Sequence, residues 1–361
     1  MTRDSKGNAF SGPGILDRSK VIVLTPKDRI TLVDIASDAG VSRATVSLVL
    51  RNVPSVAPST RKRVLQSISR LGYVYHRGAA NLRTQRSHSI GLIVSDITNP
   101  FFAEIIIAIE DWLGSAGFVT ILGNTSENPE KQQRLLKSLS EYPADGILIC
   151  PTLGSVTEAG NLAMRRPPVV AFTRPMNGLD YAGVDNIAGS ELAIDHLAAL
   201  GHRHIAFIGG PSAVSSAQQR FLGYRQGLEK NGIPFRQDRF IEQAPNRNGG
   251  FQGLMAALTL SPAPTAAVCF NDVVALGAME ALRSMGKAPG SDFSIVGFNN
   301  IADAHFGGLT TVDTSPAKIG EAAADLLLHR IKEPTAPVRQ VILTPRLIAR
   351  ASTAPAPAGA E

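Results

Sequence analysis

The chain has 361 residues, of which 44% are hydrophobic and 18% are charged, and its formal net charge is +6 at pH 7. This composition indicates a soluble globular protein of two or three compact units, and no apolar run approaches the roughly 18 residues that a membrane-spanning helix needs. Residues 1–29 lack the apolar region of a signal peptide, and Cys150 and Cys269 are the only cysteines, so we expect a cytoplasmic protein with no membrane partner and no disulfide framework.

The positive charge is concentrated in the first quarter of the chain. Residues 1–88 contain 15 basic and five acidic residues, a net charge of +10, whereas residues 89–361 contain 21 basic and 25 acidic residues, a net charge of −4. A run of charge usually marks only a solvated surface. Here it coincides with the motif described next, which favours a partner with a phosphate backbone.

Two short helices joined by a tight turn are predicted within residues 30–52. Thr31 can cap the first helix, Gly40 supplies the turn, and Ser42 can cap the second helix. The apolar residues spaced by three and four on these helices are Leu32, Ile35, Ala36, Ala39, Val46, Val49 and Leu50. The pattern is typical of a helix-turn-helix, whose second helix enters the major groove of DNA. An ordinary pair of antiparallel helices has the same short pattern, so both interpretations stay open at this point.

A third helix is expected after a loop, with Ser59 as its cap and Gly72 at its end. Its predicted apolar stripe consists of Val64, Leu65, Ile68 and Leu71. Three helices of this size can form a complete headpiece, which we place at residues 30–74 after a flexible extension at residues 1–29.

Residues 75–88 are basic and weakly patterned, which is typical of a linker or hinge. Leu82 is an isolated large apolar residue among the cations Arg77, Arg83 and Arg86. An apolar side chain in such a setting is also typical of a wedge that enters the minor groove.

From Ser89 onward, apolar strands alternate with amphipathic helices. The expected elements are 89–95, 100–117, 119–124, 130–142, 146–150, 169–173, 189–200, 205–210, 216–231, 249–258, 266–270, 273–286 and 294–298. Continuous apolar strands between helices predict parallel sheets with helices on both faces.

The expected fold is therefore an N-terminal all-α helix-turn-helix headpiece followed by an α/β core of two doubly wound parallel-sheet subdomains. We place the core at residues 89–353, with the boundary between subdomains near residue 187 and return crossovers after about residue 310. Residues 354–361 are rich in Pro and Ala and are expected to be disordered.

Ligands of doubly wound sheets bind beyond the carboxyl ends of the strands. The polar and aromatic residues that follow the predicted strands are Asp96, Asn99, Phe101, Phe102, Asn124, Arg174, Asp185, Asn271, Asp272, Asn299 and Asn300. Each Asn or Asp alone is explained by a turn or a helix cap. Their convergence on one cleft favours a small polyhydroxylated or heterocyclic ligand.

Separated motifs run through most of the chain, among them TLVDIASDAGVSRATVSLVL, AANLR, SIGLIVSDITNPFFAEI, GVDNIAG, GHRHIAFIGG, FNDVVALGAMEAL and SIVGFNNI. The chain resembles the LacI/GalR family of bacterial transcriptional repressors through these motifs, over roughly residues 30–353. The resemblance implies a homodimer that binds a palindromic DNA operator, and a periplasmic-binding-protein-like core that senses a small effector. We expect a sugar or sugar derivative, with a purine or another metabolite as the alternative and either sign of control open.

The resemblance also implies roles for single residues. Base edges would be faced by Arg43, Ala44 and Leu48, while Leu82 would enter the minor groove beside Ala79 of a hinge helix. Phosphate contacts are implied for Thr31, Ser42, Thr45 and Ser47, and Arg51 adds another where the family commonly has Asn. Including the strand-end residues, the expected effector site consists of Asp96, Asn99, Phe101, Phe102, Arg174, Asp185, Arg220, Asn271 and Asn299.

Some positions depart from the family pattern. Leu48 stands where many members carry Arg, so the operator cannot be inferred from relatives. Tyr75 and His76 stand where Pro and Asn are common, and Gly78 lowers helix propensity by about 1 kcal/mol relative to Ala, so we expect the hinge to be unfolded away from DNA. Asn299 replaces a usual Asp, which weakens the case for a cationic or donor-rich ligand.

Two other classes of protein fit parts of the pattern. The core alone would suit a solute-binding receptor of the periplasmic-binding-protein type, but the basic first quarter argues against it. A nucleotide-dependent enzyme is disfavoured because neither GxGxxG after the first strand nor GxxxxGK[ST] is present. We interpret His202 and His204 as turn residues and expect no metal site, cofactor or catalytic residue. Without leucine heptads in the tail, we expect a dimer rather than a tetramer.

Overall fold

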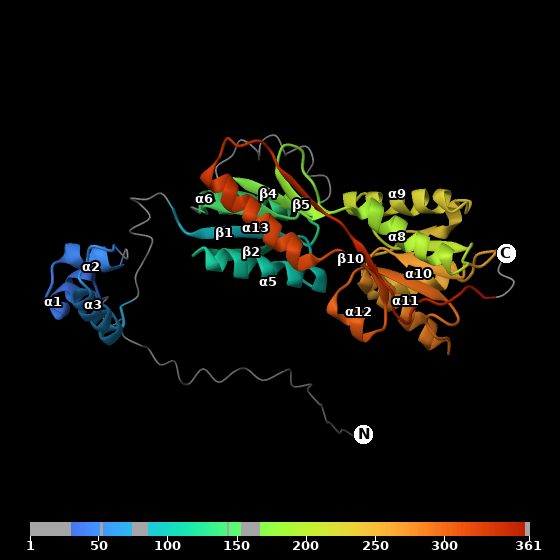
Figure 1. Ribbon diagram of the computed structural model, residues 1–361, viewed down its shortest axis with the longest axis horizontal. Helices are drawn as coiled ribbons and strands as arrows, with labels where there is room; N and C mark the ends of the chain where they lie inside the picture. The colour runs from blue at the N-terminus through green and yellow to red at the C-terminus, as the bar shows by residue number, and fades with distance from the viewer. Residues whose placement is uncertain (1–29, 51–52, 74–85, 143, 153–166, 358–361) are drawn as a thin grey trace, which may run out of the picture. The chain divides into compact units, whose positions relative to one another are not determined.

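The computed structural model describes residues 30–50, 53–73, 86–142, 144–152 and 167–357. The chain forms two compact units, residues 1–80 and 81–361, which are described separately (Figure 1). The predicted extension and the positions Arg51, Ala79 and Leu82 lie outside the described residues, so their predicted roles stay predictions.

The first unit contains the predicted helix-turn-helix. Thr31 and Asp34 form a capping box at the first helix, Gly40 ends that helix with φ 62°, and Ser42 Oγ accepts a hydrogen bond from the Thr45 backbone N–H at 3.1 Å. The helices are α1 (Leu32–Ala39), α2 (Arg43–Leu50) and α3 (Pro58–Leu71). The predicted caps and turn are therefore confirmed.

A small apolar core joins the three helices. Ile35, Val46 and Val64 are completely buried in it, with Leu32 and Ile68 packed around them. A polar clamp that the sequence analysis did not predict adds to this core: Asp38 on α1 accepts hydrogen bonds from Ser67 and Arg70 on α3. The clamp and the core together hold α3 against α1.

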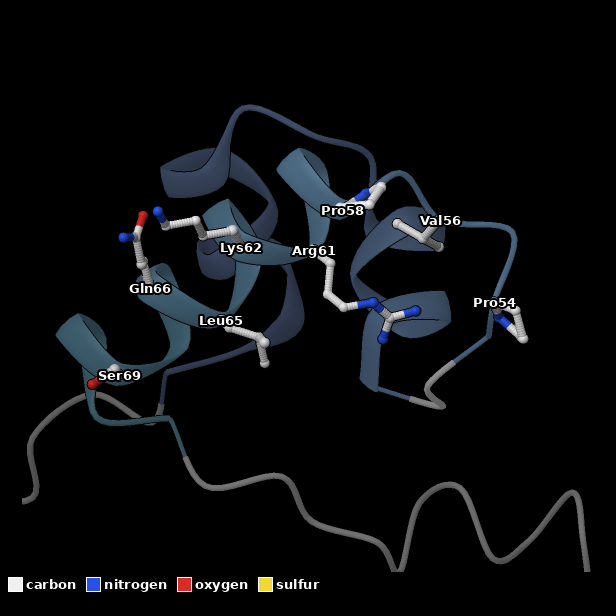
Figure 2. Close-up of a pocket in the computed structure, with 8 residues that line it drawn as sticks. All are labelled: Pro54, Val56, Pro58, Arg61, Lys62, Leu65, Gln66 and Ser69. Atoms are coloured by element: carbon white, nitrogen blue, oxygen red, sulfur yellow. The ribbon is translucent and has the colours of Figure 1, made fainter.

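Two predictions for the third helix are wrong. The helix begins at Pro58 and not after Ser59, because proline has a fixed φ and lacks an N–H, which suits the first helical position. Leu65 is 51% exposed instead of buried, since it points about 100° away from Val64 around the helix axis. It lies beside Lys62 on the outer face of α3, where it lines a shallow hollow (Figure 2).

The first lobe of the second unit is built on a sheet with the order β11-β5-β4-β3-β1-β2, in which the paired strands are all parallel. Its strands are β1 (Ser89–Val94), β2 (Val119–Asn124), β3 (Gly146–Ile149), β4 (Val169–Phe172), β5 (Asp180–Val184) and β11 (Gln340–Leu343). Its helices are α5 (Pro100–Ser115), α6 (Pro129–Glu141) and α13 (Pro316–Lys332).

The second lobe repeats this architecture with the strand order β12-β10-β9-β8-β6-β7, in which only β12 is antiparallel to its neighbour among the described strands. Its strands are β6 (Ile205–Ile208), β7 (Phe240–Ile241), β8 (Ala266–Cys269), β9 (Ser294–Asn299), β10 (Thr310–Asp313) and β12 (Arg346–Ile348). Its helices are α8 (Asn186–Ala199), α9 (Ser215–Lys230), α10 (Arg247–Ala257), α11 (Asp272–Ser284) and α12 (Ala302–Phe306).

Both faces of each sheet are covered by helices (Figure 1). In β1, Leu92 and Val94 pack in the same apolar core as α5 and α13, whereas Ile93 packs on the α6 side. In β6, Ile208 packs with α10 and α11, whereas Phe207 packs with α8 and α9. Because successive side chains of a strand point to opposite faces, strands buried on both sides are apolar throughout. The predicted α/β core is confirmed.

The chain passes between the lobes at three places within the described residues: after β5, after β10, and between β11 and β12. The first lies at Val184–Asn186, next to the predicted boundary, and the others follow residue 310 as expected. The predicted disordered tail begins too early, because Ala354 and Ala356 hydrogen-bond to Ser294 and Leu200 in the second lobe. No helix of the described part is long and apolar enough to cross a membrane.

Candidate functional site

The start of helix α2 presents an exposed cationic surface. Arg43 and Ala44 are exposed in its first turn, which contains no acidic residue, while Ser47 and Leu48 one turn later are half-buried. The N-terminal end of a helix carries a partial positive charge and free N–H groups, which together favour phosphate oxygens. This end of α2 can therefore approach a nucleic-acid backbone with Arg43 reaching farthest.

The hydroxyl groups with predicted phosphate contacts already have intramolecular partners. Thr31 Oγ1 donates to Asp34 Oδ2 at 2.7 Å, and the hydroxyls of Ser42 and Thr45 lie 2.9 Å apart. A hydroxyl offers one donor and two acceptor positions, so capping leaves capacity for a further contact. The first function of these residues in this structure is to fix the two helix starts.

A small cavity lies between the two lobes of the second unit, with about 60 Å³ of free volume. Its lining residues are Asn99, Phe101, Phe102, Thr173, Arg174, Val184, Asn186, Ser216, Arg220, Phe270, Asn271, Asn299 and Ile319. This volume is well below the roughly 300 Å³ or more of typical ligand pockets. The lobes therefore lie close together in this structure, and a metabolite needs a wider space between them.

Most of the predicted effector residues meet at this cavity, but Asp96 and Asp185 do not. Asp96 accepts hydrogen bonds from the backbone N–H and the hydroxyl of Thr98 and forms a turn. Asp185 is exposed and caps α8 through the Ala188 N–H at 3.0 Å. The turn explains the presence of Asp96 and the helix cap explains that of Asp185. Neither residue belongs to the cavity lining.

Arg220 is the most highly connected side chain of the cavity. It is 6% exposed, and its guanidinium donates to Asn186 Oδ1 at 2.9 Å, to the Phe270 carbonyl at 2.5 Å and to Asn299 Oδ1 at 3.3 Å. The guanidinium also lies over the Phe298 ring, 3.8 Å from its centroid. Burial lowers the pKa of Arg220 to about 9, so it remains protonated at neutral pH.

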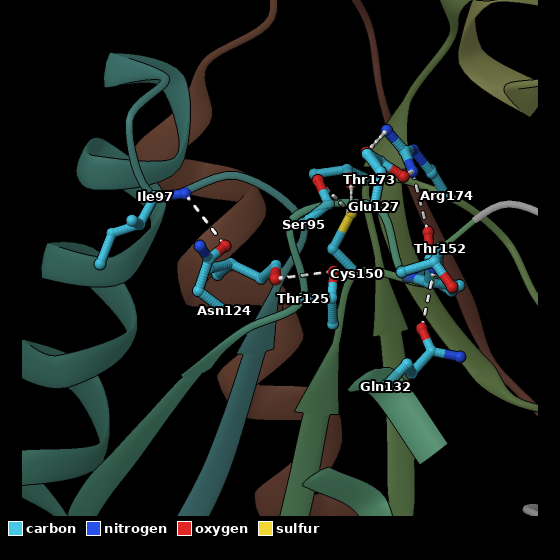
Figure 3. A network of polar contacts seen from close by, with 12 residues as sticks. Ser95, Ile97, Asn124, Thr125, Glu127, Gln132, Cys150, Thr152, Thr173 and Arg174 are labelled. Atoms are coloured by element: carbon cyan, nitrogen blue, oxygen red, sulfur yellow. Dashed lines mark hydrogen bonds and ion pairs between the residues drawn. The ribbon is translucent and has the colours of Figure 1, made fainter. Parts of the chain in front are cut away.

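Arg174 forms the first-lobe side of the cavity. Its guanidinium makes a two-pronged ion pair with Glu127, at 2.7 and 2.9 Å, and donates to the Pro151 carbonyl (Figure 3). Beside it, the hydroxyl of Thr173 hydrogen-bonds to the buried Cys150 thiol, whose pKa is raised by burial. This network connects the ends of β3 and β4 and holds Arg174 in one orientation.

Asn99 and Asn271 each combine a structural role with a place in the lining. Asn99 Oδ1 accepts from the Phe101 N–H at the start of α5, and Asn271 Oδ1 accepts from the Val274 N–H at the start of α11. Asn299 ends β9 with φ 112°, a conformation that Asn tolerates better than most residues. The two caps and the end of β9 place three amide side chains around the cavity.

The sequence analysis missed several lining residues, namely Thr173, Val184, Asn186, Ser216, Phe270 and Ile319. Two of them carried a signal. Asn186 follows Asp185 in the motif GVDNIAG, and Ser216 precedes Arg220 by one helical turn and so lies on the same face of α9. Val184 and Ile319 are apolar residues whose place in a cavity depends on packing between the lobes.

His202 and His204 lie in the segment between α8 and β6. His202 is buried before β6, with its ring nitrogens bonded to the hydroxyls of Thr265 and Ser294 and to the Ala354 carbonyl. No group of three potential metal ligands from His, Cys, Asp or Glu occurs among the residues that the structure describes.

Acid should destabilise the core partly through His202. Burial lowers the pKa of His202 below its usual 6.5, so as the pH falls through 6.5 the unfolded state binds a proton before the folded state does. The contribution of the neutral, buried His202 to the free energy of unfolding is therefore complete above pH 6.5 and is lost as the pH falls below that value. We expect His202→Gln to reduce the loss in unfolding free energy between pH 7 and pH 5, measured with urea. The exposed His305→Gln serves as the control; equal pH dependence in wild type and His202→Gln would contradict the assignment.

Comparison with known proteins supports both parts of this picture. The family model for bacterial regulatory proteins of the lacI family matches residues 31–75, and that for a periplasmic binding protein-like domain matches residues 194–353. The HTH-type transcriptional repressor PurR of Mannheimia succiniciproducens is 32% identical over 327 residues, which cover 89% of this chain and 98% of that protein.

Solved structures give the same result. The lac repressor dimer bound to operator and the anti-inducer ONPF is 28% identical with a TM-score of 0.78, covering 90% of this chain and 99% of the other. The transcriptional regulator CelR in complex with cellobiose is 28% identical with a TM-score of 0.68, covering 90% of this chain and all of the other. Together with the lacI-type headpiece, the similarity along nearly the whole of PurR shows that the chain belongs to the LacI family of bacterial regulatory proteins.

Proposed function

We propose that this protein is a dimeric transcriptional repressor that binds a palindromic operator and changes its operator affinity when a small effector, a sugar or sugar derivative, binds between the lobes of its core. One observation carries the proposal: the same chain has a helix-turn-helix with an exposed cation at the start of its second helix and a cavity between two lobes that polar and aromatic side chains line. Relatives are named as repressors rather than enzymes, and we propose no catalytic role.

Operator affinity and specificity come from different residues in this proposal. Phosphate contacts from the caps Thr31, Ser42 and Thr45 position α2, while Arg43 reads a base edge beside Ala44 and Leu48. Ser47 and Arg51 add phosphate contacts. Leu82, next to Ala79 in the hinge, enters the minor groove between the two half-sites.

Effector control follows from the three interlobe crossings. A ligand larger than the present cavity of about 60 Å³ requires a different angle between the lobes, and that angle sets the separation of the two hinges in a dimer. A coupling of this kind typically amounts to about 1–3 kcal/mol, or roughly 5- to 150-fold in operator affinity. The seven predicted effector residues that line the cavity are the proposed contacts; Asp96 and Asp185 fix turns beside it.

Selection of bound sequences from random double-stranded DNA tests the DNA-binding part directly. The full chain should enrich a palindrome with two half-sites, because a two-fold symmetric dimer presents two identical readers. Failure to enrich any sequence, together with tight binding of a metabolite, would favour a solute receptor instead.

Dimerisation is proposed to occur through α5 and the edge strand β2. On α5, Ile107 and Trp112 are 60% and 41% exposed, and Val119 and Ile121 of β2 are also exposed although both are large apolar residues. Apolar side chains grouped beside an open sheet edge usually mark an interface.

Placing a charge on this face should separate the subunits. Ile107→Glu is expected to raise the dimer dissociation constant at least about tenfold, since a carboxylate would be desolvated beside Glu104 and Asp111, and about 1.4 kcal/mol corresponds to tenfold. Sedimentation velocity measures the change. Leu222→Glu on α9 is the matched control, at 43% exposure in the wild type. An unchanged dimer dissociation constant for Ile107→Glu would show that the dimer interface lies elsewhere.

A further inference from the structure

Two consecutive residues beside the cavity adopt a backbone conformation that is uncommon outside glycine. Asn299 ends β9 with φ 112°, and Asn300 follows it with φ 59°. A single asparagine tolerates a positive φ, but two in succession persist only where the surrounding structure holds them. The turn that they begin, residues 299–301, joins β9 to α12, and Asn299 accepts a hydrogen bond from Arg220 at 3.3 Å. The direction of the Asn299 side chain therefore depends on what fixes this turn.

A buried carboxylate fixes the inner side of the turn. Asp272 at the start of α11 has no exposed surface, and it accepts hydrogen bonds from the Ile301 backbone N–H at 2.8 Å and from the Thr311 hydroxyl. Its charge also interacts with Arg220: burial lowers the pKa of Arg220, and the carboxylate of Asp272 opposes that change. A buried carboxylate is costly unless donors or a cation compensate it, so Asp272 and its neighbours hold one another in place.

An arginine near the end of the chain fixes the outer side of the turn. Arg350 is half-buried, and its guanidinium donates to Asn300 Oδ1 at 2.8 Å and to the Leu309 carbonyl at 2.7 Å. Both contacts come from one planar group with donors in a fixed arrangement. Arg350 therefore ties the turn to the residue that precedes β10.

Arg350 belongs to a C-terminal strap, residues 350–356, which follows β12 on the second lobe. The strap is anchored without this arginine, because the Ser352 carbonyl accepts from the Ile295 N–H at 2.8 Å and Ser352 Oγ donates to the Ile295 carbonyl at 2.6 Å. Among the strap residues, all of which the structure describes, only Arg350 hydrogen-bonds to the turn. The side chain of Arg350 is thus the link between the strap and the edge of the cavity.

We propose that Arg350 is a positioning residue of the effector site, which holds Asn300 from outside the cavity and so keeps the Asn299 side chain directed at Arg220. The inference rests on the proposed effector site and adds to it a residue that lies outside the cavity lining. It also gives the C-terminal strap a role besides stability, because displacement of Arg350 would release the turn that carries Asn299.

The test follows the guanidinium of Arg220 in the full-length protein without any ligand. Protein labelled with ¹⁵N-arginine gives the rate at which the guanidinium protons of Arg220 exchange with water, and the spectrum of Arg220→Met assigns the signal. Arg350→Gln should raise this rate at least about tenfold, since exchange reports local opening and Asn299 would no longer cover one side of the guanidinium.

Thr353→Val in the same strap is the matched control. Thr353 Oγ1 lies 2.9 Å from His196 Nε2 and 3.0 Å from Thr310 Oγ1, so this variant also loses two contacts of the strap but none with the turn. Its Arg220 exchange rate should equal that of the wild type. Equal rates in wild type and Arg350→Gln overturn the proposal, and so do equal increases in Arg350→Gln and Thr353→Val, which would show a general loosening of the strap.

A second variant keeps the proposal testable should Arg350→Gln not fold. Asn300→Gly removes the acceptor of the same contact, while glycine adopts φ 59° readily. It should also raise the Arg220 exchange rate, and the double variant should show less than the product of the two increases, because both changes remove one interaction. An unchanged rate in Asn300→Gly, or a full product in the double variant, overturns the proposal.

These measurements use neither effector nor operator, so they separate the positioning role from the proposed function. A protein that selects a palindromic operator but keeps wild-type exchange in Arg350→Gln would be a repressor without this positioning residue. A protein that shows the expected exchange but selects no operator would have the positioned turn without the repressor function.

Discussion

Replacing Arg43 by alanine is expected to weaken operator binding by about 1–3 kcal/mol for each half-site, or about 2–6 kcal/mol for the dimer. Arg43 is exposed in the first turn of α2, where no acidic side chain competes for it. An arginine at this position can donate two hydrogen bonds to a guanine edge, and alanine removes both. Fluorescence anisotropy with the selected operator measures the loss, which should be smaller on unrelated DNA because phosphate contacts remain.

The control for this prediction is Arg283→Ala. Arg283 is exposed at the end of α11 in the core, so its removal changes the net charge equally but leaves the headpiece intact. Equal losses in the two variants would mean that Arg43 contributes only general charge. An unchanged operator affinity of Arg43→Ala would show that Arg43 does not contact the operator.

Arg220→Met is expected to abolish the effector response while retaining operator binding. The substitution removes the three hydrogen bonds to Asn186, Phe270 and Asn299 and the buried guanidinium that lines the cavity. Loss of a buried charged contact to a ligand costs about 2–5 kcal/mol, so effector affinity should fall roughly 30-fold or more. Operator titrations with and without effector give the response.

Folding of the variant has to be controlled, because leaving a buried oxygen of Asn186, Phe270 or Asn299 without a donor costs about 1–3 kcal/mol. Arg220→Lys keeps the charge and loses the planar fork, and it should retain part of the response. A normal response in Arg220→Met would place the effector elsewhere. Loss of operator binding in both variants, together with unfolding at lower urea concentration, would make Arg220 a structural residue.

Much of the fold was predictable because its strands are buried on both faces. Ile90, Leu92, Ile93 and Val94 have no exposed surface, so the segment is apolar without alternation and is readily recognised as a central strand. The sharp turns at Gly40 and Gly72 could be predicted because both residues have the positive φ that glycine adopts easily.

Strand β5 escaped prediction because it begins with a buried charge. Asp180 is 2% exposed and pairs with Arg330 on α13 through two contacts of 2.8 Å, 150 residues away in sequence. The Arg339 N–H, next to β11, donates to the same carboxylate. A charged residue is compatible with a buried strand only when such partners exist, and they are invisible in a local pattern.

The lining of the interlobe cavity was predictable where geometry follows from topology. Asn271 ends up in the cavity because it lies between β8 and α11, and the strand-end rule applies to it directly. The same rule also selected Asp185, although its neighbour Asn186 is the residue that turns inward to Arg220. Which of two adjacent polar residues caps the helix depends on φ, ψ and the packing of α8 against α9, and a single sequence does not specify them.

The most direct test of a ligand-controlled DNA switch is reciprocity between its two sites. Once an effector has been found, its dissociation constant is measured by calorimetry on the free protein and on the protein saturated with operator DNA. If the cavity and the headpiece are thermodynamically coupled, operator must change effector affinity by the same factor by which effector changes operator affinity, expected at roughly 5- to 150-fold. Equal effector affinity with and without operator would contradict the account.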